Sequence, residues 1–362
     1  MSIQFLGMIG HRLASEIIPA SGTLFDKDYI ARFARAHEAA GFDRILVGYW
    51  SDQPDGFLVT AHAAAHTQKI KFLLAHRPGF VAPTLAARKL ASLDHLTDGR
   101  LAVHIISGGS DSEQRRDGDF LSKAERYART DEFLSVLKQS LESPQPYDHQ
   151  GRFYQAEQAF SAIKPLQHKL PIYFGGSSPE AIDVAAQHAD VFALWGEPLK
   201  GAAETVRNVR AAAAAQGRQI AFNISFRPIL GNTEKEAWER AEHIRATAEK
   251  QLAETGYTFG LPKPQSVGAQ RLLAAAHESE RHDKVLWTGV AKLVQGGYNS
   301  TALVGTPDQV SEALLDYYRL GIHSVLIRGF DPLNDAVEYG RELLPLTREK
   351  VAALSATEKR SA

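Results

Sequence analysis

The chain has 362 residues, and its 41 lysines and arginines nearly balance 42 aspartates and glutamates. This balance gives no electrostatic basis for binding nucleic acid or an anionic membrane surface, and it favours a small-molecule partner. The sequence contains no cysteine, which excludes disulfides, thiolate metal sites and cysteine nucleophiles. Because it shows neither a signal-peptide pattern nor an apolar run near the roughly 20 residues of a membrane span, a cytoplasmic location is expected.

Short apolar runs typical of buried strands alternate with amphipathic helical patterns along the chain. The helical patterns are clearest at 27–40 and 307–320, where apolar residues recur on one face. The predicted strands are 3–7, 44–48, 70–75, 101–106, 171–175, 190–194, 220–230 and 322–328. Eight strands alternating with helices predict a single α/β domain, a (β/α)8 TIM barrel with insertions.

Two stretches depart from a plain barrel. Residues 144–165 indicate a small hairpin after a helix at 122–142, and residues 254–285 mix glycine, proline and charges with a short helix. A connection as long as 254–285 is usually functional or disordered, so we predict a mobile lid over the active site; a tolerated surface insertion is the alternative. Its expected hinges are Gly256, Gly260 and Gly268, and its expected cations are Lys263, Arg271, Arg281 and Lys284.

Polar residues follow several predicted strands. The strand 70–75 leads into His76 and the strand 101–106 into Ser107; the carboxyl ends of parallel strands are where such folds bind ligands. His11 and His76 are therefore candidate hydrogen-bond donors to a substrate or to reduced oxygen, although most of the 14 histidines are expected to be solvated or structural. Metal-ligand spacing is missing at the strand ends, so no metal is expected.

Gly176, Ser177 and Ser178 follow a strand and precede a helix. Backbone N–H groups at such a helix start can bind a phosphate, while a serine N-cap followed by proline needs no ligand. The dinucleotide-binding pattern G-x-G-x-x-G is missing. Arg227 lies midway along an apolar strand, where a buried guanidinium must find an anion; that anion is either a substrate or a structural carboxylate.

Several sequence blocks resemble the bacterial luciferase-like, flavin-dependent monooxygenases, and within them the alkanesulfonate monooxygenase branch. They are RPG (77–79), PTLAAR (83–88), LASLDHLTDGRLAVHIISGG (90–109), ERYART (125–130), KPLQHKLPIYFGGSSPEA (164–181), HADVFALWGEP (188–198), LWTGVAKL (286–293) and STALVGTPDQVSEALLDYYRLGI (300–322). The resemblance implies that a separate flavin reductase supplies reduced FMN, that molecular oxygen is the co-substrate, and that a carbon–sulfur bond is cleaved to give an aldehyde and sulfite. It also implies a homodimer or homotetramer.

The resemblance assigns roles to particular residues. It implies that Gly176, Ser177 and Ser178 hold the FMN phosphate, and that Tyr127 contacts the flavin, with a core tyrosine as the alternative. Ser107 is placed to hydrogen-bond the flavin ring edge, with capping or turn formation as the alternative. Trp195 matches the tryptophan of the branch's substrate pocket.

The pocket also departs from the branch. Ser225 and Arg227 stand where the branch carries an arginine and a histidine, and the last strand reads Arg328-Gly329-Phe330 in place of a tyrosine and a histidine. The branch's cysteine, within 51–54, is missing. An anionic organosulfur substrate bound by Arg227 and Arg328 remains the leading hypothesis, and Arg227→Ala is expected to abolish turnover in an intact fold.

Other readings of the same residues stay open. Arg328 can instead pair with Asp331 or Glu338 and never meet substrate. The altered pocket also allows monooxygenation of a sulfone, an amine or a carboxylate. A deazaflavin-dependent hydride transfer on the same barrel, or a non-catalytic flavin-binding protein, are the remaining alternatives.

Overall fold

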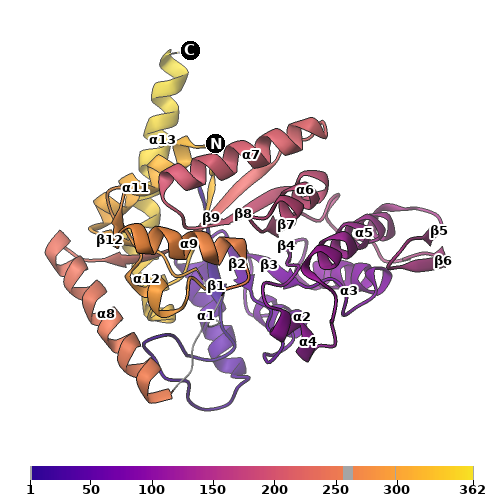
Figure 1. The fold of residues 1–362 in the computed structure, drawn as a ribbon, viewed down its shortest axis with the longest axis horizontal. Helices are drawn as coiled ribbons and strands as arrows, with labels where there is room; N and C mark the ends of the chain where they lie inside the picture. Colours follow the sequence, from indigo (N-terminus) through magenta and orange to yellow (C-terminus); the bar gives the residue numbers. More distant parts are fainter. Residues whose placement is uncertain (1, 256–263, 298, 362) are drawn as a thin grey trace.

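Eight parallel strands close into a barrel in the computed structural model, which describes residues 2–255, 264–297 and 299–361 (Figure 1). The strands, in their order around the barrel, are β1 (Gln4–Ile9), β2 (Arg44–Val47), β3 (Lys71–His76), β4 (Leu101–Ile105), β7 (Ile172–Gly175), β8 (Val191–Trp195), β9 (Ala221–Leu230) and β13 (Ser324–Ile327). Parallel pairing of β13 with β1 closes the ring. These strands coincide with the eight predicted runs, so the predicted (β/α)8 TIM barrel is confirmed.

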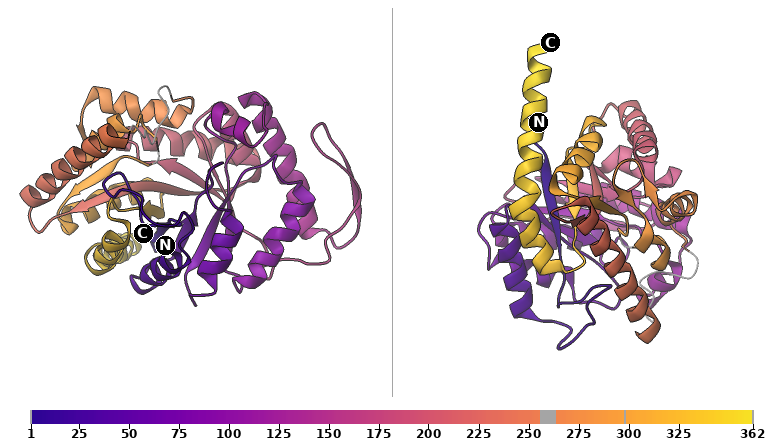
Figure 2. Two further views of the ribbon diagram at one scale, coloured as in Figure 1. Left: turned by 90° about the horizontal axis from the view of Figure 1, so that it is seen from below. Right: turned by 90° about the vertical axis from the view of Figure 1, so that its left-hand side faces the viewer.

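Helices surround this barrel. They are α1 (Lys27–Ala39), α2 (Gly56–Ala64), α3 (Pro83–Leu96), α4 (Asp111–Arg116), α5 (Lys123–Glu142), α6 (Pro179–His188), α7 (Leu199–Ala215), α8 (Glu234–Thr255), α11 (Pro307–Arg319), α12 (Pro332–Glu342) and α13 (Leu344–Ser361). Four of them, α3, α6, α11 and α12, begin at a proline. Proline suits the first turn of a helix because it lacks a backbone N–H, and an N–H at that position would have no partner within the helix. The last helix, α13, projects from the body (Figures 1 and 2). In the described chain, no helix combines the length and the hydropathy that a membrane crossing needs.

Alternation along each strand sends side chains to two different cores. Phe72 and Leu74 of β3 belong to the large core between the sheet and the helices, whereas Leu73 belongs to a small cluster inside the barrel. On β8 the outward side chains are buried, while the inward Val191, Ala193 and Trp195 remain partly exposed. The interior of the barrel is therefore open to solvent along this strand.

A smaller sheet extends from the barrel. The second half of β9 pairs in parallel with β12 (Ala302–Gly305), placing Ala302 opposite Arg227, and β11 (Leu286–Trp287) and β10 (Arg281–His282) continue it in antiparallel fashion. Around it lie α9 (Val267–Glu278) and α10 (Gly289–Leu293). The predicted hairpin is confirmed as β5 (Tyr147–Gln150) with β6 (Gln155–Ala159), which extends outward beside α5 (Figure 1).

His37 and His76 are buried and His104 is half-buried, and all three are uncharged at neutral pH. Burial lowers the pKa of His37, of His76 and of His104 to about 4 in each case. The unfolded chain takes up protons at these sites below about pH 6.5, where the folded protein does not. Their contribution to stability is therefore complete above pH 6.5 and declines as the pH falls toward 4.

We expect the free energy of unfolding to fall as the pH is lowered from about 7.5 to 5.5. Each of these histidines is expected to contribute a decrease of up to about 1.4 kcal/mol per pH unit. Urea unfolding at several pH values measures this slope. His37→Gln is expected to reduce it, and His168→Gln, at an exposed position, is the matched control. A slope that His37→Gln leaves unchanged would show that His37 does not contribute.

Candidate functional site

A glycine-serine loop joins β7 to α6 at the carboxyl end of the barrel. Gly176 has φ +146°, and a Cβ atom on it would lie 2.7 Å from the Ala181 Cβ and 3.2 Å from the Tyr127 hydroxyl. Ser178 caps α6 by accepting a hydrogen bond from the Ala181 N–H at 3.4 Å. Burial raises the pKa of Tyr127, and the hydrogen bond with Ser178 opposes that rise. The structure thus brings Tyr127 of α5 together with the predicted phosphate loop.

Gly176 provides a direct test of this loop. In Gly176→Ala, the added methyl group would collide with the Ala181 side chain. The alanine would also have to adopt a φ that is unfavourable for any residue with a Cβ, which costs about 1–3 kcal/mol of strain. We expect the protein to bind FMN about tenfold more weakly or worse, measured by fluorescence titration. Gly217→Ala is the matched control, because Gly217 has φ +67° but no atom within 4 Å of its would-be Cβ. Equal FMN affinity in the two variants would contradict a phosphate site here.

The first turn of α9 packs on this side of the barrel mouth. A Cβ on Gly268 would lie 3.5 Å from the Ser177 hydroxyl and 3.7 Å from the Trp195 ring, and one on Gly109 would lie 3.6 Å from the Ser266 Cβ. The predicted pocket residue Trp195 therefore lies at the barrel mouth beneath α9.

An ion pair anchors α9 at this place. Arg271 donates to both carboxylate oxygens of Glu197, at 2.8 and 2.7 Å. Glu197, just beyond the end of β8, is 5% exposed. The position of α9 over the mouth thus depends on a charged contact that is partly shielded from water.

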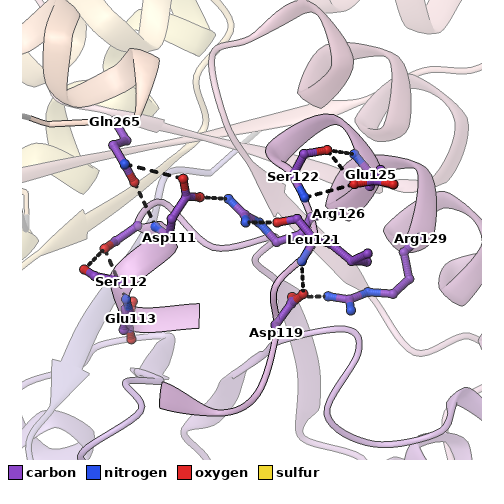
Figure 3. Close-up of polar contacts among 11 residues, drawn as sticks. Asp111, Ser112, Glu113, Asp119, Leu121, Ser122, Glu125, Arg126, Arg129 and Gln265 are labelled. Carbon is purple, nitrogen blue, oxygen red and sulfur yellow. Dashed lines mark hydrogen bonds and ion pairs between the residues drawn. The ribbon is translucent and has the colours of Figure 1, made fainter. Parts of the chain in front are cut away.

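Residues before α9 reach α4, which follows β4, the strand next to β7 in the barrel (Figure 3). The Gln265 side-chain oxygen accepts a hydrogen bond from the Asp111 N–H at 2.8 Å. Asp111, at the start of α4, also pairs with the buried Arg126 of α5 at 2.7 Å. The insertion, α4 and the part of α5 next to Tyr127 therefore form one connected polar network.

The two arginines predicted to bind the substrate meet around a carboxylate, Glu16. Arg227 is fully buried and donates to both Glu16 oxygens, at 2.7 and 2.8 Å, and to the Gly329 carbonyl at 3.0 Å. Arg328 lies 3.8 Å from Glu16, with 18% of its side chain exposed. Glu338, one of the partners considered for Arg328, is instead bound by Arg240. The anion that Arg227 required is therefore a protein carboxylate.

The remaining predicted residues are placed differently. His76 packs between Phe57 of α2 and Phe133 of α5, and Ser107 hydrogen-bonds the Thr130 hydroxyl of α5 at 3.0 Å. Both side chains thus point toward the helices and away from the barrel interior, which does not favour a flavin contact. His11 is half-buried in the loop after β1, where burial and Arg12 lower its pKa while Asp52 raises it.

The insertion 254–285 contains more regular structure than predicted. Gly268 lies in the first turn of α9. Arg281 stacks on Trp238 with 3.5 Å between cation and ring centre, and Lys284 pairs with Asp316 at 2.9 Å. Gly256, Gly260 and Lys263 lie outside the described residues. Movement of this stretch stays a prediction.

Three residues of the site were missed by the sequence reasoning: Glu16, Glu197 and Gln265. Glu16 lies in an irregular segment between β1 and α1, where no periodic pattern signals burial. Glu197 carried a usable signal, because it directly follows the strand that ends at Trp195 and so belongs to the same carboxyl-end edge.

The site can be tested against the flavin that the sequence implies. The Gly176 position, which a Cβ would fill, leaves the backbone of the loop free to approach a phosphate at the start of α6, and Tyr127 adds a hydroxyl beside it. The partly exposed interior face of β8 offers room for a ring beside Trp195. These residues fit FMN, and within the described residues no group of three side chains forms a metal site.

Comparison with known proteins agrees with this geometry. The family model for luciferase-like monooxygenases matches residues 3–324. A crystal structure of riboflavin lyase with modified FMN and riboflavin superposes with a TM-score of 0.80 at 20% identity, covering 97% of this chain and 92% of the other. EDTA monooxygenase from Chelativorans sp. BNC1 superposes with a TM-score of 0.76 at 18% identity, covering 97% of this chain and 94% of the other. An F420-dependent secondary alcohol dehydrogenase superposes with a TM-score of 0.69 at 17% identity, covering 96% of this chain and 99% of the other. At these identities the solved structures show a shared fold, while the family model covers most of the sequence. The chain therefore belongs to the luciferase-like monooxygenase family.

Proposed function

We propose that this protein is a two-component monooxygenase that desulfonates a small organosulfonate. The balanced reaction converts R–CH2–SO3⁻, reduced FMN and O2 into R–CHO, HSO3⁻, FMN and water. Reduced FMN supplies the two electrons that reduce oxygen when it is bound. The observation that carries the proposal is the placement of a phosphate-type loop at Gly176–Ser178 and a partly exposed cation, Arg328, at the same end of one open barrel.

The chain's own residues divide the work. Gly176, Ser177, Ser178 and Tyr127 hold the phosphate, and Trp195 forms an apolar wall for the ring or the substrate. Arg328 binds the sulfonate by a charge-assisted contact. The turn around Gly268 covers the mouth and excludes water, which strengthens these electrostatic contacts.

The same proposal extends to partners. A separate flavin reductase delivers the reduced FMN, and the protein acts in the cytoplasm as a homodimer or homotetramer. The site favours a small substrate, because Trp195 and α9 limit the space at the mouth of the barrel.

The test is oxygen-dependent sulfite release from a panel of alkanesulfonates and sulfonated sugars, using reduced FMN and a generic flavin reductase. Sulfite above the no-enzyme control supports desulfonation and ranks the substrates. Tight FMN binding without sulfite would overturn desulfonation while keeping the flavin site.

Monooxygenation of a carboxylate or an amine is the second candidate. It is favoured by the partly exposed Arg328, by the loss of the branch's tyrosine and histidine, and by the similarity to an EDTA monooxygenase. Oxygen uptake with such substrates, without sulfite, would select it. Turnover without oxygen uptake would instead indicate hydride transfer, the chemistry that the name of the F420-dependent neighbour indicates.

A further inference from the structure

Lys138, His188 and Asp131 form a chain of hydrogen bonds between two helices that surround the barrel. Asp131 and Lys138 both lie on α5, and His188 is the last residue of α6. The Lys138 Nζ atom lies 3.2 Å from the His188 Nδ1 atom, and the His188 Nε2 atom lies 2.8 Å from a carboxylate oxygen of Asp131. An amine, an imidazole and a carboxylate are therefore connected in series.

The two contacts determine the role of each nitrogen of His188. An ionised carboxylate can only accept a hydrogen bond, so the nitrogen beside Asp131, Nε2, carries the hydrogen. His188 is 4% exposed, and burial lowers its pKa although Asp131 opposes this change. The ring is therefore uncharged at neutral pH, and the lone pair of Nδ1 faces the Lys138 nitrogen, from which it can take a proton.

Lys138 is half-buried, and burial lowers its pKa to about 8. The charged groups around it act in both directions: Arg218 and Lys169 lower this pKa further, whereas Asp190 and Glu142 raise it. An amine with such a pKa is about one-quarter unprotonated at pH 7.5, compared with about one-thousandth for an ordinary lysine. Because only the unprotonated amine is a nucleophile, Lys138 is activated in the way that reactive lysines are.

We propose that Lys138 is an acylation site, at which its amine reacts with a small acyl phosphate while His188 acts as the base and Asp131 as the residue that positions this base. The amine nitrogen bonds to the acyl carbon, the bond from that carbon to the phosphate oxygen breaks, and the phosphate leaves with the bonding electrons. His188 Nδ1 takes the proton that the nitrogen loses, and Asp131 stabilises the resulting imidazolium. The step requires no oxidant or reductant, and the inference does not depend on the proposed flavin site.

The test treats the purified protein with acetyl phosphate and measures the initial rate of acetylation at each lysine by peptide mass spectrometry. Lys235, with 85% of its side chain exposed, is the reference within the same molecules. At pH 7.5, Lys138 is expected to react about tenfold faster than Lys235, because its larger unprotonated fraction outweighs the lower basicity of its nitrogen. The rate at Lys138 should level off above about pH 8, whereas the rate at an exposed lysine of ordinary pKa keeps rising.

His188→Gln removes the base and should slow acetylation of Lys138 about tenfold or more, while Lys235 reacts as before. Because His188 is buried, thermal unfolding must first show that this variant is folded. If it is not, Asp131→Asn provides the test, since 42% of the Asp131 side chain is exposed; this change should also slow acetylation at Lys138 alone. A Lys138 rate no higher than that of Lys235, or an unchanged Lys138 rate in the folded variant, would overturn the inference and leave the three residues as a structural contact between α5 and α6.

Discussion

Replacing Arg227 with alanine is expected to lower the free energy of unfolding by about 3–5 kcal/mol, because it removes one partner of a buried ion pair. Glu16 would lose both of its short hydrogen bonds, and the Phe330 ring would lose the cation stacked on it. Urea unfolding at pH about 7.5, far above the Glu16 pKa of about 2, measures the loss at full strength.

Two further variants separate this effect from a general loss of charge. Arg245→Ala removes an arginine whose partners, Glu242 and Glu280, are substantially exposed, and such a pair contributes at most about 1 kcal/mol. The double variant Glu16→Leu/Arg227→Met replaces the buried pair with apolar groups and should recover part of the stability. Wild-type stability in Arg227→Ala would contradict the buried pair.

The sign of the pH dependence gives an independent check. The lowered pKa of Glu16 means that the ion pair contributes its full stability above the ordinary carboxyl value, and that this contribution declines as the pH falls toward 2. The stability difference between wild type and Arg227→Ala should therefore shrink in acid. The sequence-based expectation that this variant keeps an intact fold is revised, and its kinetics must be corrected for the folded fraction.

The barrel was predictable because its signals are local. Each of the eight strands is a short apolar run, and prolines at the starts of α3, α6, α11 and α12 mark the helices that follow. The strand β12 escaped prediction, although its four apolar residues directly precede α11. Its pairing with β9 is a long-range contact that strand periodicity does not encode.

The site was predictable only where a strand end determines it. Gly176–Ser178 and Trp195 follow from their strands, whereas Glu16 lies 211 residues from the arginine that it binds, and no local pattern links them. His76 shows an alternation signal that was not used: it shares its face of β3 with Phe72 and Leu74, both in the outer core. Applying the two-residue period of the strand would have directed His76 toward the helices.

Breaking the contact that anchors α9 is expected to expose the mouth of the barrel to water. In Arg271→Ala, Glu197 loses both of its hydrogen bonds from the insertion, and α9 loses its charged contact with the residues just beyond β8. Since water that enters such a site diverts reduced oxygen to hydrogen peroxide, we expect the peroxide formed per reduced FMN to rise severalfold, about 3- to 10-fold, with little change in FMN affinity.

This outcome needs a control from the same insertion and a readout that does not depend on flavin. Lys284→Ala removes a pair with Asp316 in which the lysine is 62% exposed, so it should leave peroxide formation at the wild-type level. Acrylamide quenching of Trp195, taken as the difference from Trp195→Phe, should increase in Arg271→Ala alone, because the turn at Gly268 covers that ring. Increased quenching without extra peroxide would mean that α9 shields the tryptophan but not the reaction. If neither quantity changed, the Arg271–Glu197 pair would not hold the cover in place, and water exclusion would have to come from other parts of the mouth.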